Sequence, residues 1–241
     1  MYAVTLDNRL VHFVSDAPGN LLTEVQVAGL PSGERLVSID IRPSDGQIYG
    51  VGTDDQVYRL DNITGNATAV GSPFTPTLGG EHFGLVITSS DDRIRTSSSE
   101  TEENLRFDPA TGALLGADAN FAYASGDVNA GTNPSVAALA VSGSTLYGIE
   151  SNEDVLVRVS NPATGELTTV GSFGSNTVPC AAFDIDGSDG VAFASLATNG
   201  ISRLYTINLG TGAATLIGVI DVDSEVQGLA VATAGALVSG L

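Results

Sequence analysis

One pattern recurs along the chain: an alternating strand, a turn, and a second strand that ends in an apolar residue and Gly. The clearest copy spans 155–171 and reads V-L-V-R-V-S-N-P-A-T-G-E-L-T-T-V-G. Similar copies begin at Gln56, Asn104 and Arg203, and a degenerate copy begins at Arg9. A chain built from such copies is expected to form a repeat architecture, in which each copy adds one similar unit.

The glycines of the recurring turns give the repeat length. They are Gly19, Gly65, Gly112, Gly165 and Gly212, spaced 46 to 53 residues apart. A period of roughly 40–50 residues with four short strands per unit is typical of β-propellers. Blocks of β-branched and aromatic residues bounded by Gly, Asn and Asp predict strands throughout, and no segment has convincing helical periodicity. The sequence therefore predicts an all-β propeller that occupies residues 1–241 as one domain.

Each unit opens on a segment of apolar and small residues, which we assign to the inner strands: 36–42, 83–88, 136–141, 180–185 and 226–232. The chain begins on the second strand of a unit, at 2–5, and ends on a first strand. The last strand is therefore predicted to complete the first blade, which pairs both ends of the chain and leaves no open sheet edge. We expect five blades of four antiparallel strands, with six as the alternative, and residues 236–241 as a redundant strand or frayed end.

The third unit differs from the others. Its second strand reads Arg93-Ile94-Arg95 where other units carry an aromatic residue, as in Ile48-Tyr49-Gly50. A polar, Gly-rich insertion at 120–133 is predicted to extend the outer half of the same blade. Because insertions on one face of a repeat protein often carry binding, we direct attention to this unit.

Composition bears on the environment of the protein. The chain has no Lys, so its nine basic residues are all Arg, and its formal net charge is −19. Such a charge disfavours binding to nucleic acid or to anionic membranes, and no apolar run is long enough for membrane insertion. The Lys-free composition, rich in Ser, Thr and Gly, indicates an extracellular or cell-surface protein whose leader has been removed. Cys180 is the only cysteine, which excludes an internal disulfide.

Several segments resemble a known family. They are D-R-I-R from Asp92, N-L-R-F-D-P-A-T-G from Asn104, G-E-R-L-V-S-I-D-I-R-P-S-D-G-Q-I-Y-G from Gly33, and L-Y-T-I-N-L-G-T-G-A-A-T-L-I-G from Leu204. Together they are similar to the family of domain of unknown function 4394, over nearly the whole chain. The resemblance implies a propeller-like fold and an exported protein, and it implies no activity. The family usually has an acidic segment before D-R-I-R, where this chain has Val86-Ile87-Thr88-Ser89, so a function of that acidic position would be lost or altered in this protein.

Two inner-strand carboxylates are the first candidate site. Asp40 and Asp184 occupy equivalent positions, where the other copies have Val86, Ala140 and Ala230. Five-bladed glycoside hydrolases place catalytic carboxylates on inner strands, so the pair could supply an acid and a nucleophile or base. The favoured alternative is structural: these side chains accept backbone hydrogen bonds and tie the blades together.

The second candidate joins polar residues of two neighbouring strands: Asp92, Arg93, Arg95, Asn104 and Arg106. Arg93 and Arg95 share one face of their strand, and Arg106 lies on the next strand if the hairpin is regular. Guanidinium groups in this arrangement could bind a carboxylate or sulfate ligand. The alternative is an ion-pair network with Asp92, Asp108 and the glutamates of 100–103.

A third segment, Asp184-Ile185-Asp186-Gly187-Ser188-Asp189-Gly190, resembles an oxygen-ligand Ca²⁺ loop built on Asp184, Asp186 and Asp189. An Asp-Gly turn between two strands explains it equally, so we assign no metal or cofactor. The two histidines, His12 and His82, sit in unrelated positions of the repeat, which excludes a multi-His metal site. Cys180, beside small residues, is predicted to be a buried thiol.

The sequence leaves two functional hypotheses open. The favoured one is a non-catalytic extracellular module that binds or displays a carbohydrate, a surface polymer or a protein, with the blade-three arginines as its site. The alternative is a glycan-active hydrolase that uses Asp40 and Asp184. Neither hypothesis involves nucleic acid.

Overall fold

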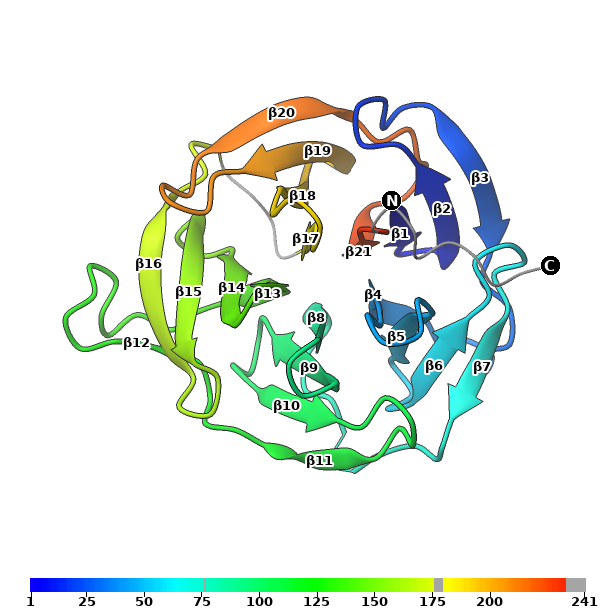
Figure 1. Ribbon diagram of the computed structural model, residues 1–241, viewed down its shortest axis with the longest axis horizontal. Coiled ribbons are helices and arrows are strands. Elements are labelled where there is room, and N and C mark those ends of the chain that lie inside the picture. Colours follow the sequence, from blue (N-terminus) through cyan, green and yellow to red (C-terminus); the bar gives the residue numbers. More distant parts are fainter. Residues whose placement is uncertain (76, 176–179, 233–241) are drawn as a thin grey trace.

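The computed structural model describes residues 1–75, 77–175 and 180–232, and it forms a ring of five β-sheets around a central axis (Figure 1). The predicted all-β propeller is therefore confirmed, with five blades and not six. The described residues include no helix that is long and apolar enough to cross a membrane. The predicted tail at 236–241 lies outside the described residues.

Each blade has four antiparallel strands, which are named in order from the axis outward. Blade one contains β21 (Val226–Ala230), β1 (Tyr2–Thr5), β2 (Arg9–Phe13) and β3 (Leu21–Gln26). Blade two contains β4 (Leu36–Ile41), β5 (Ile48–Gly52), β6 (Val57–Leu60) and β7 (Ala67–Val70). Blade three contains β8 (Phe83–Thr88), β9 (Arg93–Ser98), β10 (Asn104–Phe107) and β11 (Leu114–Ala117). Blade four contains β13 (Val136–Ser142), β14 (Thr145–Glu150), β15 (Val155–Asn161) and β16 (Glu166–Ser172), and blade five contains β17 (Ala181–Ile185), β18 (Ala192–Thr198), β19 (Ile201–Ile207) and β20 (Ala214–Val219).

The ring closes as the phase of the repeat predicts. β21, from the end of the chain, pairs with β1 and becomes the inner strand of the first blade, with Ala230 opposite Tyr2. Figure 1 shows β21 in red beside β1 in dark blue. The two ends of the propeller are thus hydrogen-bonded within one sheet.

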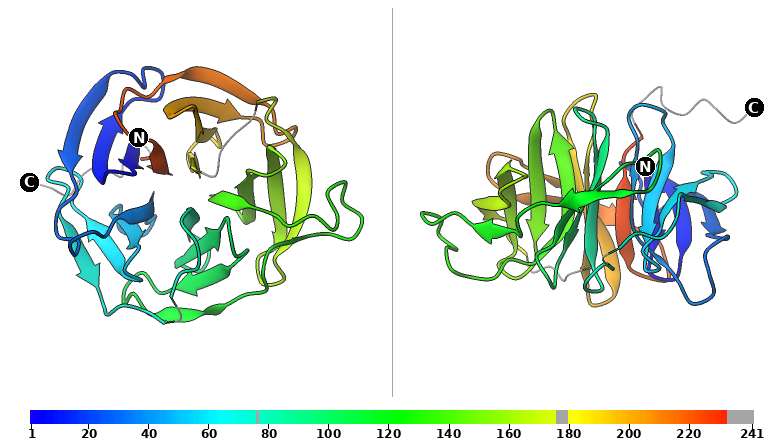
Figure 2. Two further views of the ribbon diagram at one scale, coloured as in Figure 1. Left: turned by 180° about the vertical axis from the view of Figure 1, so that it is seen from behind. Right: turned by 90° about the horizontal axis from the view of Figure 1, so that it is seen from below.

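The insertion belongs to a different blade from the one predicted. β12 (Ala122–Tyr123) pairs in parallel with β16, so it forms a fifth strand of blade four and does not extend blade three. Phe121 and Tyr123 are buried in the apolar cluster that contains Leu167 of β16, and this burial fixes the segment there. The rest of the insertion projects from the ring at the position of β12 (Figure 2).

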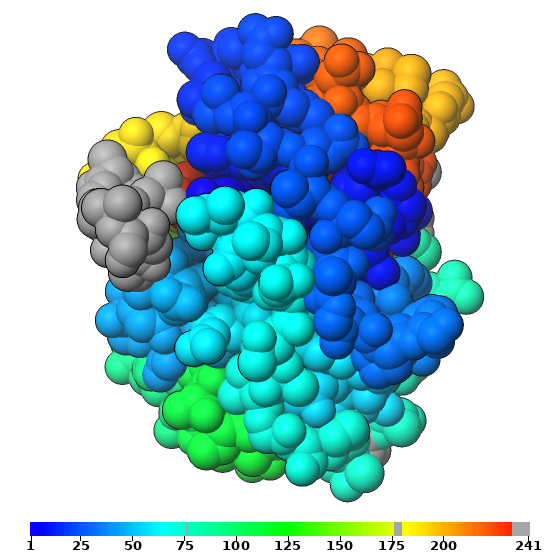
Figure 3. All heavy atoms as spheres, turned by 90° about the vertical axis from the view of Figure 1, so that its right-hand side faces the viewer, coloured from blue at the N-terminus to red at the C-terminus, as the bar shows by residue number. Residues whose placement is uncertain are grey.

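The hydrophobic core is divided among the five contacts between neighbouring blades. Between blades one and two, for example, Leu10 packs in one cluster with Ile39 and Leu60. Burying one such side chain fully contributes roughly 1.5–3 kcal/mol to folding. Main-chain bonds join the same two blades at the outer wall, where the Ala28 N–H donates to Gly65 O (3.1 Å) and the Ala67 N–H to Ala28 O (2.7 Å). Figure 3 views this wall, with blade one in blue and blade two in lighter blue and cyan.

Candidate functional site

A cavity of about 530 Å³ lies at the end of the ring where the inner strands terminate. All five blades contribute to its lining through residues at or just after the ends of their inner strands: Arg42, Ser89, Gly143, Ser188 and Val231. Asp40 and Asp184 line the same cavity. The structure therefore brings together the two inner-strand carboxylates that the repeat alignment made equivalent.

Each of these carboxylates is held by two backbone N–H groups. Asp40 accepts one from Ile41 of its own strand (Oδ1, 2.6 Å) and one from Ile87 on β8 of the next blade (Oδ2, 2.6 Å). Asp184 accepts one from Ile185 (Oδ1, 2.7 Å) and one from Val231, just after β21 (Oδ2, 2.6 Å). These are the blade-joining bonds that were predicted as the alternative to catalysis.

Burial shapes the ionisation of the pair. Asp40 is 6% exposed and Asp184 is 8% exposed. Burial raises the pKa of both carboxyl groups, and the like charge of Asp184 raises that of Asp40 further. The backbone N–H groups act in the opposite direction, because they stabilise the charged form, but they do not cancel the effect of burial.

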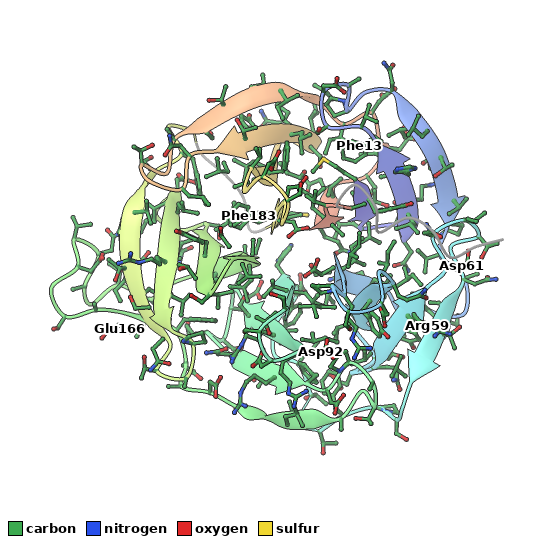
Figure 4. All side chains as sticks on the ribbon, in the orientation of Figure 1. Phe13, Arg59, Asp61, Asp92, Glu166 and Phe183 are labelled. Atoms are coloured by element: carbon green, nitrogen blue, oxygen red, sulfur yellow. The ribbon has the colours of Figure 1, made fainter. Side chains whose placement is uncertain are left out.

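Arg42 links the cavity to blade three. Its guanidinium donates to Asp92 of the β8–β9 turn (Nε to Oδ1, 2.9 Å) and to Asp45 (Nη1 to Oδ2, 3.0 Å), and it lies over the Tyr49 ring. The bond from Arg42 lowers the pKa of Asp92, which is the first residue of the D-R-I-R segment. Figure 4 shows Asp92 close to the inner strands. Asp92 was predicted to bind a ligand, but in the structure its carboxylate forms an ion pair with Arg42 that joins blades two and three.

The predicted hairpin of arginines is present. Arg106 on β10 lies directly opposite Arg95 on β9. Both contact one oxygen of Asp118, with Arg95 Nη1 2.8 Å and Arg106 Nε 2.9 Å from Oδ2. The Arg106 contact is an ion pair without hydrogen-bond geometry, since its Nε has no hydrogen-bond partner. Sequence reasoning missed Asp118, which lies just after β11.

The other two residues of this candidate have backbone partners. Arg93 Nη1 donates to the carbonyl of Asp92 at 3.1 Å. Asn104 is 1% exposed, and its Nδ2 donates to the carbonyl of Pro162 in blade four at 2.6 Å. Asn104 therefore helps to dock blade three on blade four, while Arg93 remains partly exposed near the turn.

The Asp-rich segment of blade five forms a turn. Asp186 Oδ1 accepts the Ser188 N–H (2.8 Å), and Asp189 Oδ1 accepts the Val191 N–H (2.9 Å). Within the described ranges, no three His, Cys, Asp or Glu side chains are grouped so that they could hold a metal ion. Cys180 is buried, and burial raises the pKa of its thiol to about 12.

Comparisons with known proteins place the fold. A structural-genomics protein of unknown function from Bacteroides thetaiotaomicron has a TM-score of 0.54 at 14% identity, over 96% of this chain and 64% of that one. Myxococcus xanthus glutaminyl cyclase has a TM-score of 0.51 at 14% identity, over 84% of this chain and 79% of that one. Kuenenia stuttgartiensis hydrazine synthase has a TM-score of 0.46 at 16% identity, over 83% of this chain and half of that one. At these identities the likeness to the first two proteins shows the fold alone.

No curated protein matches the sequence. A family model described as a domain of unknown function (DUF4394) matches residues 9–230, which is nearly all of the propeller. The chain therefore belongs to the DUF4394 family.

Proposed function

We propose that this protein is a non-catalytic binding module that works outside the cell and takes a carbohydrate into the axial cavity. The observation that carries the proposal is the fixing of Asp40 and Asp184 by two backbone N–H groups each, at the wall of that cavity. Carboxylates held in this way are preorganised acceptors, which bind a ligand without losing side-chain freedom.

The carboxylates keep capacity for a ligand. A carboxylate has about four lone-pair sites, and the backbone N–H groups use two of them in each side chain. Sugar hydroxyl groups are suitable donors for the remaining sites. Ile41, Ile87 and Val141 add apolar wall surface, against which the C–H faces of a sugar ring can pack.

The glycan-active hydrolase remains the second candidate, because a raised carboxyl pKa in a cavity is typical of catalytic acids. A general acid, however, must gain and lose a proton during each turnover. Each of the four carboxyl oxygens of Asp40 and Asp184 already accepts a backbone N–H group, so none of them is free of a fixing bond when a proton must pass to a leaving group. The geometry therefore supports binding better than catalysis.

The experiment is a polysaccharide and glycan array that is read both for retained protein and for released sugar. Ser89→Trp tests the cavity, because Ser89 lines it and is exposed, while Ser90→Trp is the control, because Ser90 is exposed but does not line it. We expect retention by the wild type and by Ser90→Trp, loss with Ser89→Trp, and unchanged melting temperatures.

Released sugar would replace the proposal with the hydrolase. A blank array with folded protein would overturn carbohydrate binding and favour a protein ligand. The proposed location has a separate test: with the native gene expressed in its host, the protein should be found in the medium or on protease-accessible surfaces. Recovery only from inside intact cells would contradict that part of the proposal.

A further inference from the structure

Blade three breaks a pattern that the other four blades share. In each blade, the strand pairing places one residue from each of the four strands side by side, and we call these four residues a row. Rows at the same position in different blades can then be compared. On the second strand this row contains Tyr2, Tyr49, Tyr147 and Phe193 in blades one, two, four and five, and Arg95 in blade three. On the fourth strand it contains Thr23, Thr68, Thr168 and Thr215 in those blades, and Gly116 in blade three. In this row, blade three therefore has an arginine where the other blades have an aromatic residue, and a glycine where they have a threonine.

The third strand of the same row supplies a second guanidinium. It contains Arg106 in blade three, and Arg59 and Arg158 in blades two and four. Arg59 and Arg158 stand opposite tyrosines and are exposed, and Figure 4 shows Arg59 on the strand β6. Only in blade three do two arginines of this row face each other.

The two guanidinium groups share one carboxylate. Arg95 and Arg106 both contact Oδ2 of Asp118, and their side chains are 11% and 33% exposed while that of Asp118 is 8% exposed. The cluster therefore carries one surplus positive charge in a protein whose net charge is −19. Arg106 Nε is buried against Asp118. Within the part of the chain that the structure describes, the Arg106 guanidinium donates no hydrogen bond, so the N–H groups of its Nη1 and Nη2 are the donors left for a ligand.

There is room beside these donors. A Cβ atom built on Gly116 would meet only Arg106 Nη2, at 3.7 Å. The row lies on the face of blade three that meets blade four, because Ser97 on β9 and Asn104 on β10 share this face by strand alternation and donate to blade-four carbonyls. Apart from Val86, the apolar cluster at this contact consists of residues from blade four and the insertion.

We propose that Arg95, Arg106 and Asp118 form an anion-binding recess between blades three and four, which takes a carboxylate or sulfate group. Arg106 binds the anion through the N–H groups of Nη1 and Nη2, and Arg95 adds positive charge next to it. Asp118 holds the two guanidinium groups together when no ligand is bound. Arg93, two residues before Arg95 on the same strand face, is partly exposed and adds positive charge beside the row. This recess is distinct from the axial cavity, whose lining includes none of the three, so the inference does not depend on the proposed function.

The test is isothermal titration calorimetry with sodium sulfate and with sodium glucuronate, at ionic strength matched with NaCl. Both anions should bind the wild type, and Arg106→Ala should weaken binding at least about tenfold, because a charge-assisted contact is lost. Arg59→Ala removes the equivalent arginine of blade two and should leave binding unchanged. Asp118→Asn should strengthen anion binding, because both guanidinium groups lose their competing carboxylate.

Thermal unfolding supplies an independent readout. Sulfate should raise the melting temperature of the wild type and Arg59→Ala beyond the effect of matched chloride, and it should not do so for Arg106→Ala. A sulfated or uronate oligosaccharide that binds more tightly than the free anion would identify a polymer as the source of the group, and equal affinity would identify the free anion. The proposal is overturned if neither anion binds the wild type or Asp118→Asn, or if Arg106→Ala binds as the wild type does.

Discussion

Asp40 and Asp184 accept backbone N–H groups that the inner strands of the ring leave without a strand partner. The inner edge of each inner strand pairs with no further strand, so its N–H groups need other acceptors. Asp40 satisfies Ile87 in the next blade, and Asp184 satisfies Val231, and both bonds span 47 residues, about one repeat. The two carboxylates therefore join neighbouring blades, and they line the cavity because the residues that they contact lie at its wall.

The pH dependence of stability should reveal this buried pair. Because burial raises the pKa of both carboxyl groups, the folded protein holds more protons than the unfolded chain at pH values above the ordinary Asp pKa of about 3.9. The free energy of unfolding should therefore fall as pH rises from about 4 through the raised pKa values. Urea unfolding at several pH values between 4 and 8 measures the slope.

Asp184→Asn should make that slope shallower, because it removes one raised pKa and the like charge that raises the other. The variant should also be about 1–3 kcal/mol less stable near pH 4, because one amide oxygen replaces two oxygens that each accepted an N–H group. This difference should shrink as the pH rises, because the wild type alone loses stability through Asp184. Asp221→Asn, at an exposed position, changes the net charge equally and should keep the wild-type slope. Equal slopes for Asp184→Asn and wild type would contradict the account.

Asp118 shows where residue-level prediction stopped. Alternation along two strands was enough to place Arg95 and Arg106 side by side. Their shared carboxylate follows the next strand, and the register there shifts between Arg106 and Phe107. A bulge of this kind changes which residues face each other, and the local sequence does not mark it. The predicted network therefore named other acidic residues.

At the scale of elements, the recurring turn of one blade also contacts the preceding blade. Gly112, in the turn of blade three, has φ +70°, and a Cβ atom on it would collide with the carbonyl oxygen of Val70 at the end of β7. The turn thus packs backbone against backbone on the preceding blade. This explains why the repeated sequence has Gly at the end of its turn, beyond the demands of the turn itself.

Gly112→Ala should therefore cost more than backbone strain alone. Gly190→Ala is the matched control, because Gly190 has φ +77° and nothing within 4 Å of its added Cβ. The control should lose about 1–2 kcal/mol from the left-handed conformation. Gly112→Ala should lose roughly 1–3 kcal/mol more, because the two blades must separate. Chemical denaturation compares them, and equal losses would show that the turn does not act as a blade contact.

The composition of 120–133 was enough to predict an insertion, but it did not predict that the insertion pairs with β16 of blade four. β12 has only two residues, which is too short for a period-two pattern to indicate a face. Its parallel pairing with β16 depends on the burial of Phe121 and Tyr123, and the acceptor strand lies more than 40 residues further along the chain. Such a contact is set by tertiary packing, which local sequence does not encode.

At the scale of the whole molecule, the repeat period and its phase were sufficient to predict five blades and the closing strand. Each unit contains four strand signals, and the first strand at the end of the chain can pair with the second strand at its start, which favoured five blades over the alternative of six. The axial cavity could not be predicted in the same way. Its lining comes from the ends of five inner strands and the residues that follow them, and its shape depends on how the five blades pack around the axis.

One buried side chain of the last strand adds to the closure of the ring. Gln227 is 4% exposed on β21, its Nε2 donates to the carbonyls of Thr5 and Leu36, and its Oε1 accepts from Arg35 Nη1 at 2.8 Å. It therefore joins the end of the chain to blade one and to blade two at once. Gln227→Ala should lower the free energy of unfolding by about 1–3 kcal/mol, because three buried or partly buried groups lose their partner.

The strands that lose protection in the variant show whether Gln227 closes the ring or only packs within it. Gln56 is a matched control, since it is 3% exposed but donates to Val57 O (2.9 Å) and Val70 O (2.7 Å) within blade two alone. In hydrogen–deuterium exchange, Gln227→Ala should accelerate the amides of β21 and β1 most, because the ring opens where its two ends meet. Gln56→Ala should instead accelerate β6 and β7. If both variants accelerate the same strands, the ring has no preferred opening point, and β21 acts as one inner strand among five.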